Sequence, residues 1–153
     1  MLMRVRGIKV PGEISAIYFH TSDPIALERP LGITPLQAGF PAPTENYVEA
    51  MIDLNRDLIK NPLTIFYAHV ENDSMEPLIH DGAMVIYGSS LEVRSGHTCV
   101  AIIDGDWCAK HYCEHRGGQI SLVSENEKYA PTVITREMDF IMRGRVTGAI
   151  HLF

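Results

Sequence analysis

Long hydrophobic segments are missing from this 153-residue sequence. The longest uninterrupted apolar runs, residues 83–87 and 99–103, have five residues each, whereas a membrane-spanning helix needs about 20. The first residues also lack the apolar stretch that a signal peptide requires. We therefore expect no membrane segment and a cytoplasmic location.

Basic residues are also in short supply. Thirteen Lys and Arg stand against nineteen Asp and Glu, which gives a net charge of −6. The imbalance lies in residues 39–153, which carry nine basic and sixteen acidic side chains. Because non-specific nucleic-acid affinity comes mainly from clustered Lys and Arg, we expect no direct sequence-specific DNA binding.

Cysteine is scarce, with Cys99, Cys108 and Cys113 as the whole set. An odd number of cysteines without an export signal argues against a disulfide framework, so we expect reduced thiols. Hydrophobic residues make up 46% and charged residues 21% of the chain, as in ordinary globular proteins. The length allows one compact domain plus an arm.

The prolines divide the chain into two parts. Six of the nine prolines lie within residues 1–43, and proline both removes a backbone donor and restricts the residue before it. Residues 1–43 are therefore predicted to form an extended N-terminal arm, with one short strand near 14–19. Residues 44–153 are predicted to form the folded domain.

Within this domain, the apolar spacing of residues 44–59 predicts one helix, or two short helices broken near Asp53. Short β-rich runs separated by turn residues follow, and they predict a mainly β domain of antiparallel strands. The predicted strands are residues 63–70, 83–87, 98–103, 107–113, 119–123 and 140–150. Asp104-Gly105 supplies the residue pair that tight hairpins favour, so strands 98–103 and 107–113 are predicted to pair.

Two residues carry candidate chemistry, and each has an ordinary alternative. Ser74 follows a predicted strand in a turn-rich segment, where a serine usually bonds local backbone but could also be presented to a substrate. Lys110 lies in an apolar and aromatic strand. It is either an edge-strand lysine facing water or a buried amine that takes a proton from Ser74. Such a Ser-Lys dyad needs no histidine, metal or cofactor.

A group of metal-ligand types also lies close together in the sequence: Cys108, His111, Cys113 and His115. On a strand the last three would share one face. Their spacing matches no standard zinc motif, and cysteine often serves as a small buried hydrophobe. We therefore predict no metal site.

Five motifs occur in a fixed order from residue 37 to the C-terminus. They are Ala38-Gly39-Phe40-Pro41-Ala42-Pro43, Ile52-Asp53-Leu54-Asn55 with Asn61-Pro62, Asp73-Ser74-Met75, His80-Asp81-Gly82, and Lys110 after Asp104-Gly105. In order and spacing they resemble the self-cleaving LexA-type serine peptidases (peptidase S24), most closely the UmuD, MucA and RumA branch. The resemblance implies a scissile bond at Ala38-Gly39, Ser74 as nucleophile and Lys110 as general base.

Four positions depart from the family pattern: Asn72, Ala83, His97 and His111. Asn72 stands where the family usually has glycine, and asparagine can also adopt left-handed backbone angles. The others replace two acidic residues and one basic residue. These departures bear on rate and regulation more than on chemistry.

The arm separates two branches of this family. LexA-type repressors carry an N-terminal helix-turn-helix domain, whose recognition helix needs packed supporting helices, and 38 proline-interrupted residues cannot supply it. The resemblance therefore implies a UmuD-like accessory protein of an error-prone Y-family DNA polymerase in the SOS response. It further implies cleavage triggered by a RecA filament on single-stranded DNA, and a homodimer. The rival interpretation is a non-enzymatic dimeric adaptor with a vestigial dyad.

Overall fold

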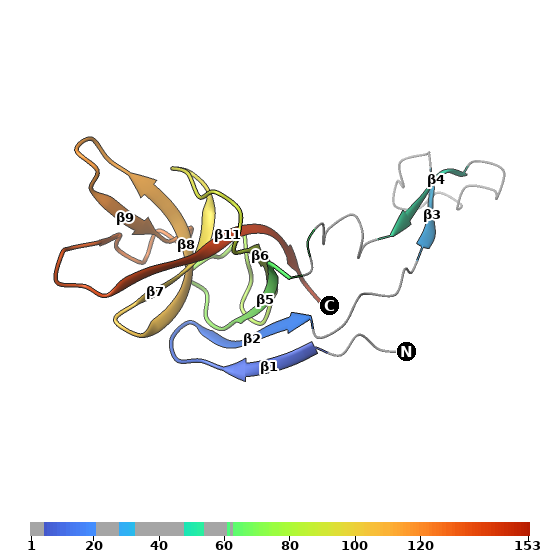
Figure 1. Cartoon of the computed structure of the whole chain (residues 1–153), viewed down its shortest axis with the longest axis horizontal. Coiled ribbons are helices and arrows are strands. Elements are labelled where there is room, and N and C mark those ends of the chain that lie inside the picture. Colours follow the sequence, from blue (N-terminus) through green and yellow to red (C-terminus); the bar gives the residue numbers. More distant parts are fainter. Residues whose placement is uncertain (1–4, 21–27, 33–47, 54–60, 62) are drawn as a thin grey trace.

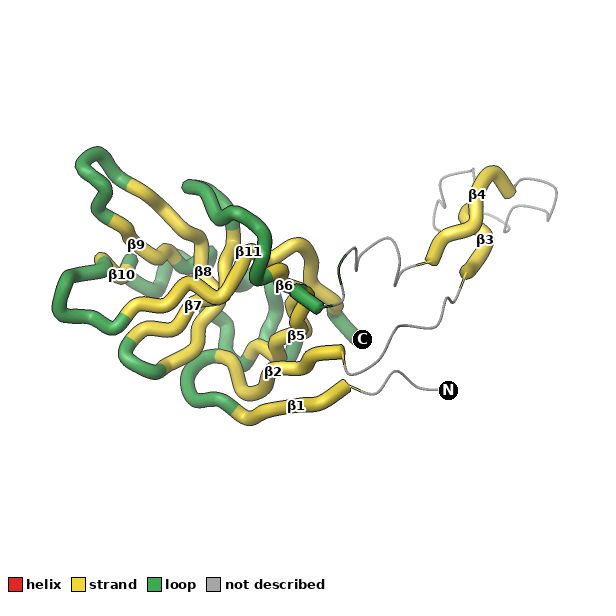
Figure 2. The backbone as a smooth tube through the Cα atoms, viewed as in Figure 1, coloured by secondary structure: helices red, strands yellow, loops and turns green. Residues whose placement is uncertain are grey.

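The computed structural model describes residues 5–20, 28–32, 48–53, 61 and 63–153. Nine strands form one antiparallel sheet in the order β1-β2-β5-β6-β11-β7-β8-β9-β10 (Figure 1; β10 is labelled in Figure 2). Their bounds are β1 Val5–Lys9, β2 Ile14–His20, β5 Ile65–Val70, β6 Met84–Gly88, β7 Thr98–Ile103, β8 Asp106–Glu114, β9 Ile120–Val123, β10 Thr132–Val133 and β11 Phe140–Ile150. A separate two-stranded sheet pairs β3 (Glu28–Gly32) with β4 (Val48–Asp53).

The predicted mainly β fold is confirmed. All six strands predicted after residue 62 are present, with bounds within a few residues of those expected, and only the short β10 was not predicted. The predicted hairpin joins β7 to β8, with Ile103 paired to Asp106. Its central residues Asp104 and Gly105 have φ of 50° and 91°, the left-handed angles that a two-residue turn of this kind requires.

The helix predicted at residues 44–59 is wrong where it can be compared. Residues 48–53 form strand β4, which pairs with β3 in antiparallel register. The apolar spacing and the intrinsic helix propensity of a short segment are weak determinants of its structure. Hydrogen bonding to a partner strand outweighs them here. The described residues contain strands and loops only (Figure 2). Within that part of the chain, no helix has the length and hydrophobicity to cross a bilayer.

The N-terminal residues join the main sheet. The strand predicted near 14–19 is confirmed as β2, whereas its hairpin partner β1 was not predicted. In Figure 1 this hairpin runs beside β5, with which β2 pairs. Ile14 and Ile17 are buried in the same core cluster as Ala68 and Val70 of β5. The domain boundary predicted at 43/44 lies outside the described residues.

The core lies under the turn that follows β5. The fully buried Met75 and Ile79 of that turn pack in one cluster with Val85 and Tyr87 of β6 and Val100 of β7. Burial raises the pKa of the Tyr87 hydroxyl to about 12. Apolar packing of Met75 and Ile79 against β6 and β7 therefore fixes the turn that carries Ser74, and with it the candidate site.

Candidate active site

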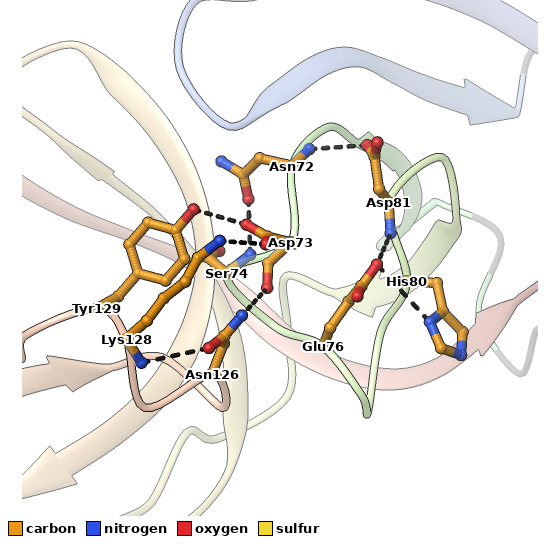
Figure 3. Close-up of polar contacts among 9 residues, drawn as sticks. All are labelled: Asn72, Asp73, Ser74, Glu76, His80, Asp81, Asn126, Lys128 and Tyr129. Carbon is orange, nitrogen blue, oxygen red and sulfur yellow. Dashed lines mark hydrogen bonds and ion pairs between the residues drawn. The ribbon is translucent and has the colours of Figure 1, made fainter.

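Ser74 lies in a turn whose backbone is shaped by polar side chains. Asn72 adopts the left-handed region with φ of 88°, so the prediction that asparagine preserves this turn is confirmed. The Ser74 amide donates to Asn72 Oδ1 at 2.9 Å, and the Asn72 amide donates to Asp81 Oδ1 at 2.8 Å (Figure 3). The Ser74 side chain points inward, and the residue is only 1% exposed.

A second network ties this turn to the loop after β9 (Figure 3). Asn126 Nδ2 donates to the Asp73 carbonyl at 3.0 Å, and the Asn126 amide donates to the Ser74 carbonyl at 3.0 Å. The Tyr129 hydroxyl donates to Asp73 Oδ1 at 2.6 Å, and Lys128 forms an ion pair with the same carboxylate. The position of Ser74 is thus fixed from two segments that are far apart in the sequence.

These contacts also change the pKa values of Asp73, Lys128 and Tyr129. The hydrogen bond from Lys128, followed by that from Tyr129, lowers the pKa of the Asp73 carboxyl. The same contacts raise the pKa of Lys128 and that of the Tyr129 hydroxyl. Opposite charge and hydrogen bonding to the carboxylate both favour the ionised Asp73.

Lys110 occupies the middle of β8, which lies between β7 and β9 in the sheet. It is 9% exposed, and its Nζ lies 5.8 Å from the centre of the Tyr129 ring. The alternative of an edge-strand lysine facing water is therefore wrong. A lysine held in a buried strand needs a partner for its charge.

That partner is Glu13, from the loop between β1 and β2. Lys110 Nζ lies 2.9 Å from Glu13 Oε1 and 2.7 Å from Oε2. Ser74 Oγ donates to the same Oε2 at 3.1 Å. The structure therefore brings Ser74 and Lys110 to one carboxylate oxygen, although 36 residues separate them. Their catalytic roles stay predictions.

Some residues of the site were not predicted from the sequence, and two predicted residues lie outside the part of the chain that the structure describes. Glu13 was missed because its partners are 61 and 97 residues away, and no local pattern signals such contacts. Asn126 and Tyr129 were missed for the same reason, and Asp73 was noted only as part of the motif that carries Ser74. The predicted cleavage pair, Ala38 and Gly39, lies outside the described residues.

A cleft of about 590 Å³ adjoins Glu13 and Lys110. Trp107 and Cys108 of β8 and Glu71 and Asn72 of the turn also line it. Burial, followed by the negative charge of Glu13, raises the pKa of the Cys108 thiol to about 11. Gly12 and Glu13, in the loop between β1 and β2, form part of the wall of this cleft.

The two histidines in and directly after β8 have hydrogen-bond partners. His111 Nε2 is hydrogen-bonded to Glu125 Oε2 at 2.6 Å, and His111 Nδ1 to the Thr98 hydroxyl at 3.1 Å. His115 Nε2 is hydrogen-bonded to the Ser121 hydroxyl at 2.7 Å. Cys108 and Cys113 are free thiols. Among the described residues, no three His, Cys, Asp or Glu side chains gather as metal ligands.

Comparison with known proteins matches residues 30–147 to the family model Peptidase S24-like. The SamA protein of Salmonella typhimurium is 29% identical over 130 residues, which cover 84% of this chain and 89% of SamA. The ImpA protein of Escherichia coli is 27% identical over 142 residues, or 90% of this chain and 96% of ImpA. The LexA repressor of Actinobacillus succinogenes is 33% identical over 117 residues, or 74% of this chain and 55% of the repressor.

Proposed function

Because this chain belongs to the Peptidase S24-like family, we propose that it is a serine endopeptidase that cleaves its own Ala38-Gly39 bond. The observation that supports this most is the meeting of Ser74 and Lys110 at one carboxylate oxygen beside an open cleft. A buried serine hydroxyl and a buried lysine amine are the two groups that a Ser-Lys dyad requires.

In the proposed reaction, neutral Lys110 Nζ takes the proton of the Ser74 hydroxyl as Oγ attacks the Ala38 carbonyl carbon. The resulting tetrahedral intermediate collapses when the C–N bond to Gly39 breaks. Lys110 returns the proton to the departing Gly39 amine. Water then hydrolyses the ester between Ser74 and Ala38, with Lys110 again acting as base.

The protein surroundings are suited to these steps. Asn126 and Asp73 hold the turn of Ser74 in place, and positioning of this kind contributes much of the rate in enzymes. The neighbouring backbone amides of the turn are proposed to stabilise the oxyanion. The Ser74 amide itself donates to Asn72 Oδ1. Thirty-five residues separate Gly39 from Ser74, which gives the arm ample reach at about 3.3 Å per extended residue.

We further propose a cellular role as a UmuD-like accessory subunit of a UmuC-like Y-family DNA polymerase. Near full-length likeness to SamA and ImpA supports this role over that of a repressor. Cleavage is proposed to be stimulated by a RecA filament on single-stranded DNA during the SOS response. The cut then activates polymerase support, because Ile14 and Ile17 cover apolar core beside β5 until the arm leaves.

The proposal is tested by incubating wild-type protein and Ser74→Ala with RecA, single-stranded DNA and a nucleotide at neutral pH. Wild type is expected to yield residues 1–38 and 39–153 by mass, and Ser74→Ala to stay intact. Polymerase binding is then compared between cleaved wild type and intact Ser74→Ala. Equal binding by both would favour the rival, a non-enzymatic adaptor with a vestigial dyad.

A homodimer is proposed on the family resemblance and on exposed apolar groups near the C-terminus. Ile150 is 41% exposed, and Leu152 and Phe153 are almost fully exposed. Exposed apolar patches often mark surfaces that bind another protein. Light scattering at tens of micromolar is expected to give twice the chain mass, and a strict monomer would remove this part of the proposal.

A further inference from the structure

The loop between β1 and β2 forms backbone hydrogen bonds with Trp107 of β8 and with Glu71 at the start of the turn that carries Ser74. The surface between these two residues is called the peptide groove below. The Glu13 amide donates to the Trp107 carbonyl at 2.8 Å, and the Trp107 amide donates to the Pro11 carbonyl at 2.9 Å. On the other side, the Glu71 amide donates to the Glu13 carbonyl at 2.8 Å. Residues 11–13 are thus held between β8 and the start of the turn that carries Ser74.

Close approach to β8 requires glycine in the middle of this segment. A Cβ atom built on Gly12 would lie 2.5 Å from the Trp107 carbonyl oxygen and 2.6 Å from the Trp107 amide nitrogen. Gly12 also has φ of 102°, a backbone angle that other residues rarely adopt. The groove therefore accepts a residue without a side chain at this point.

The side chain of Glu13 disables both members of the predicted dyad. Ser74 donates its hydroxyl hydrogen to Glu13 Oε2, so this hydrogen is not directed at an amine. Lys110 is an ammonium in an ion pair with the same carboxylate. An ammonium has no lone pair with which to accept a proton. The Glu13 carboxylate thus lies 3.1 Å from Ser74 Oγ, the atom that has to contact the scissile carbonyl.

We propose that residues 11–13 are an internal pseudosubstrate, which occupies the peptide groove and must leave before the chain can be cleaved. The inference rests on the proposed function, because it names what competes with the scissile segment. The backbone groups of Trp107 and Glu71 that hold residues 11–13 can pair with any extended peptide. The sequence Ala38-Gly39 offers such a peptide with a glycine, the residue type that the groove accepts.

Release of the pseudosubstrate is a local event. Ile14 and Ile17 anchor β2 in the core, whereas Pro11 and Gly12 are exposed at the surface. The loop can therefore swing out while β2 stays paired with β5. The fraction of molecules with an empty groove then sets the cleavage rate, and an activating partner acts by raising that fraction.

The test compares wild-type full-length protein with Glu13→Gln and Gly12→Ala. Glu13→Gln keeps the shape of the side chain but removes the ion pair with Lys110. Gly12→Ala leaves all charges in place and forces residues 11–13 away from Trp107. Matched controls are Glu114→Gln, an exposed carboxylate on β8, and Gly148→Ala, where an added Cβ meets only Ile86 Cδ1 at 3.9 Å.

Two measurements are made on each protein at alkaline pH without partners. The first is the rate at which the mass of residues 1–38 appears. Both loop variants are expected to cleave about tenfold faster than wild type or more, because they raise the fraction of molecules with an empty groove. The second is hydrogen exchange at the Trp107 and Glu71 amides, which is expected to quicken in Gly12→Ala and not in Gly148→Ala.

Each outcome separates this inference from the proposed function. Cleavage of wild type at Ala38-Gly39 with equal or slower cleavage of Glu13→Gln would overturn the pseudosubstrate and make Glu13 a helper of the dyad. If no form is cleaved, the proposed function fails, and the exchange measurement alone decides whether residues 11–13 occupy the groove. Unchanged exchange at both amides in a folded Gly12→Ala would overturn the inference in either case.

Discussion

Two irregular segments meet at Ser74, and different kinds of bonds hold them. The turn at residues 71–82 is fixed by its own side chains and by Asn126 and Tyr129 from a distant loop. The loop at residues 10–13 is held mainly by backbone groups of Trp107 and Glu71, with one carboxylate added. Side-chain networks fit one partner, whereas backbone pairing accepts any extended chain. The turn is thus built as a permanent part of the site, and the loop as an occupant that can be replaced.

The largest effect is expected from Lys110→Arg, which removes the base and leaves a positive charge. Arginine cannot deprotonate in a useful pH range, so cleavage is expected to fall at least about 10²-fold. In wild type the rate is expected to rise with pH, because only the neutral amine accepts the Ser74 proton. A pH–rate profile checks this, and an unchanged profile in Lys110→Arg would rule out Lys110 as the base.

A large loss of stability is expected from Ile14→Ala, which tests how firmly the loop is anchored beside the core. Ile14 is 0% exposed, and truncating a buried isoleucine costs about 2–5 kcal/mol of unfolding free energy. Ile8→Ala is the matched control in the same hairpin, because Ile8 is 56% exposed. It is expected to change stability by about 0.5 kcal/mol or less. Equal urea midpoints for the two variants would mean that β2 is not part of the folded core.

A smaller effect is expected when the fixed turn is loosened by Asp73→Asn. Cleavage is expected to fall about tenfold, since small misplacements of a nucleophile are costly. Glu92→Gln, which breaks an exposed ion pair with Arg94 elsewhere, is expected to have no effect. A rate for Asp73→Asn equal to that of this control would mean that the network does not position Ser74.

Thermal unfolding of Asp73→Asn has its own pH signature. The pKa of Asp73 is lowered in the folded state, so its stabilising contribution is present above the ordinary aspartate value of about 3.9. That contribution disappears as the pH falls through the lowered pKa. The difference in melting temperature between wild type and Asp73→Asn is therefore expected to be steady near neutral pH, to shrink once the pH falls below about 4, and to vanish only below the lowered pKa of Asp73. A difference that grows on acidification would contradict this sign.

The smallest effect is expected at Cys108, because the reactivity of its thiol depends in part on the negative charge of Glu13 in the loop at residues 10–13. Its pKa is raised to about 11, first by burial and then by Glu13. Alkylation of Cys108 in native protein at pH 8 is therefore expected to be slow. Glu13→Gln removes a neighbouring negative charge, so Cys108 is expected to react modestly faster. Cys99, which is buried with a pKa of about 12, serves as the internal control.

Features that depend on neighbouring residues could be predicted from the sequence, whereas contacts between distant segments could not. The positions of β2, of the six strands predicted after residue 62 and of the Asp104-Gly105 hairpin follow from local alternation and turn chemistry, and they were predicted correctly. Strands β1, β3 and β10 were not predicted. Ser74 was singled out by its turn after a predicted strand and Lys110 by its apolar strand, and the order and spacing of the family motifs then joined the two residues into a dyad. Contacts of Glu13 and Asn126 depend on how distant segments meet, and residues 48–53 became a strand through pairing with β3. Such long-range pairing leaves no signature in a short window of sequence.

The most direct test of the Ser74-Lys110 account is an intact-mass time course of the purified full-length chain at alkaline pH, with no RecA, DNA or other protein present. The account predicts two fragments, residues 1–38 and 39–153, whose masses together equal the parent plus one water. It also predicts that Ser74→Ala remains whole under the same conditions. A cut at Ala38-Gly39 in Ser74→Ala, or a wild-type chain cut only at another bond, would contradict the account.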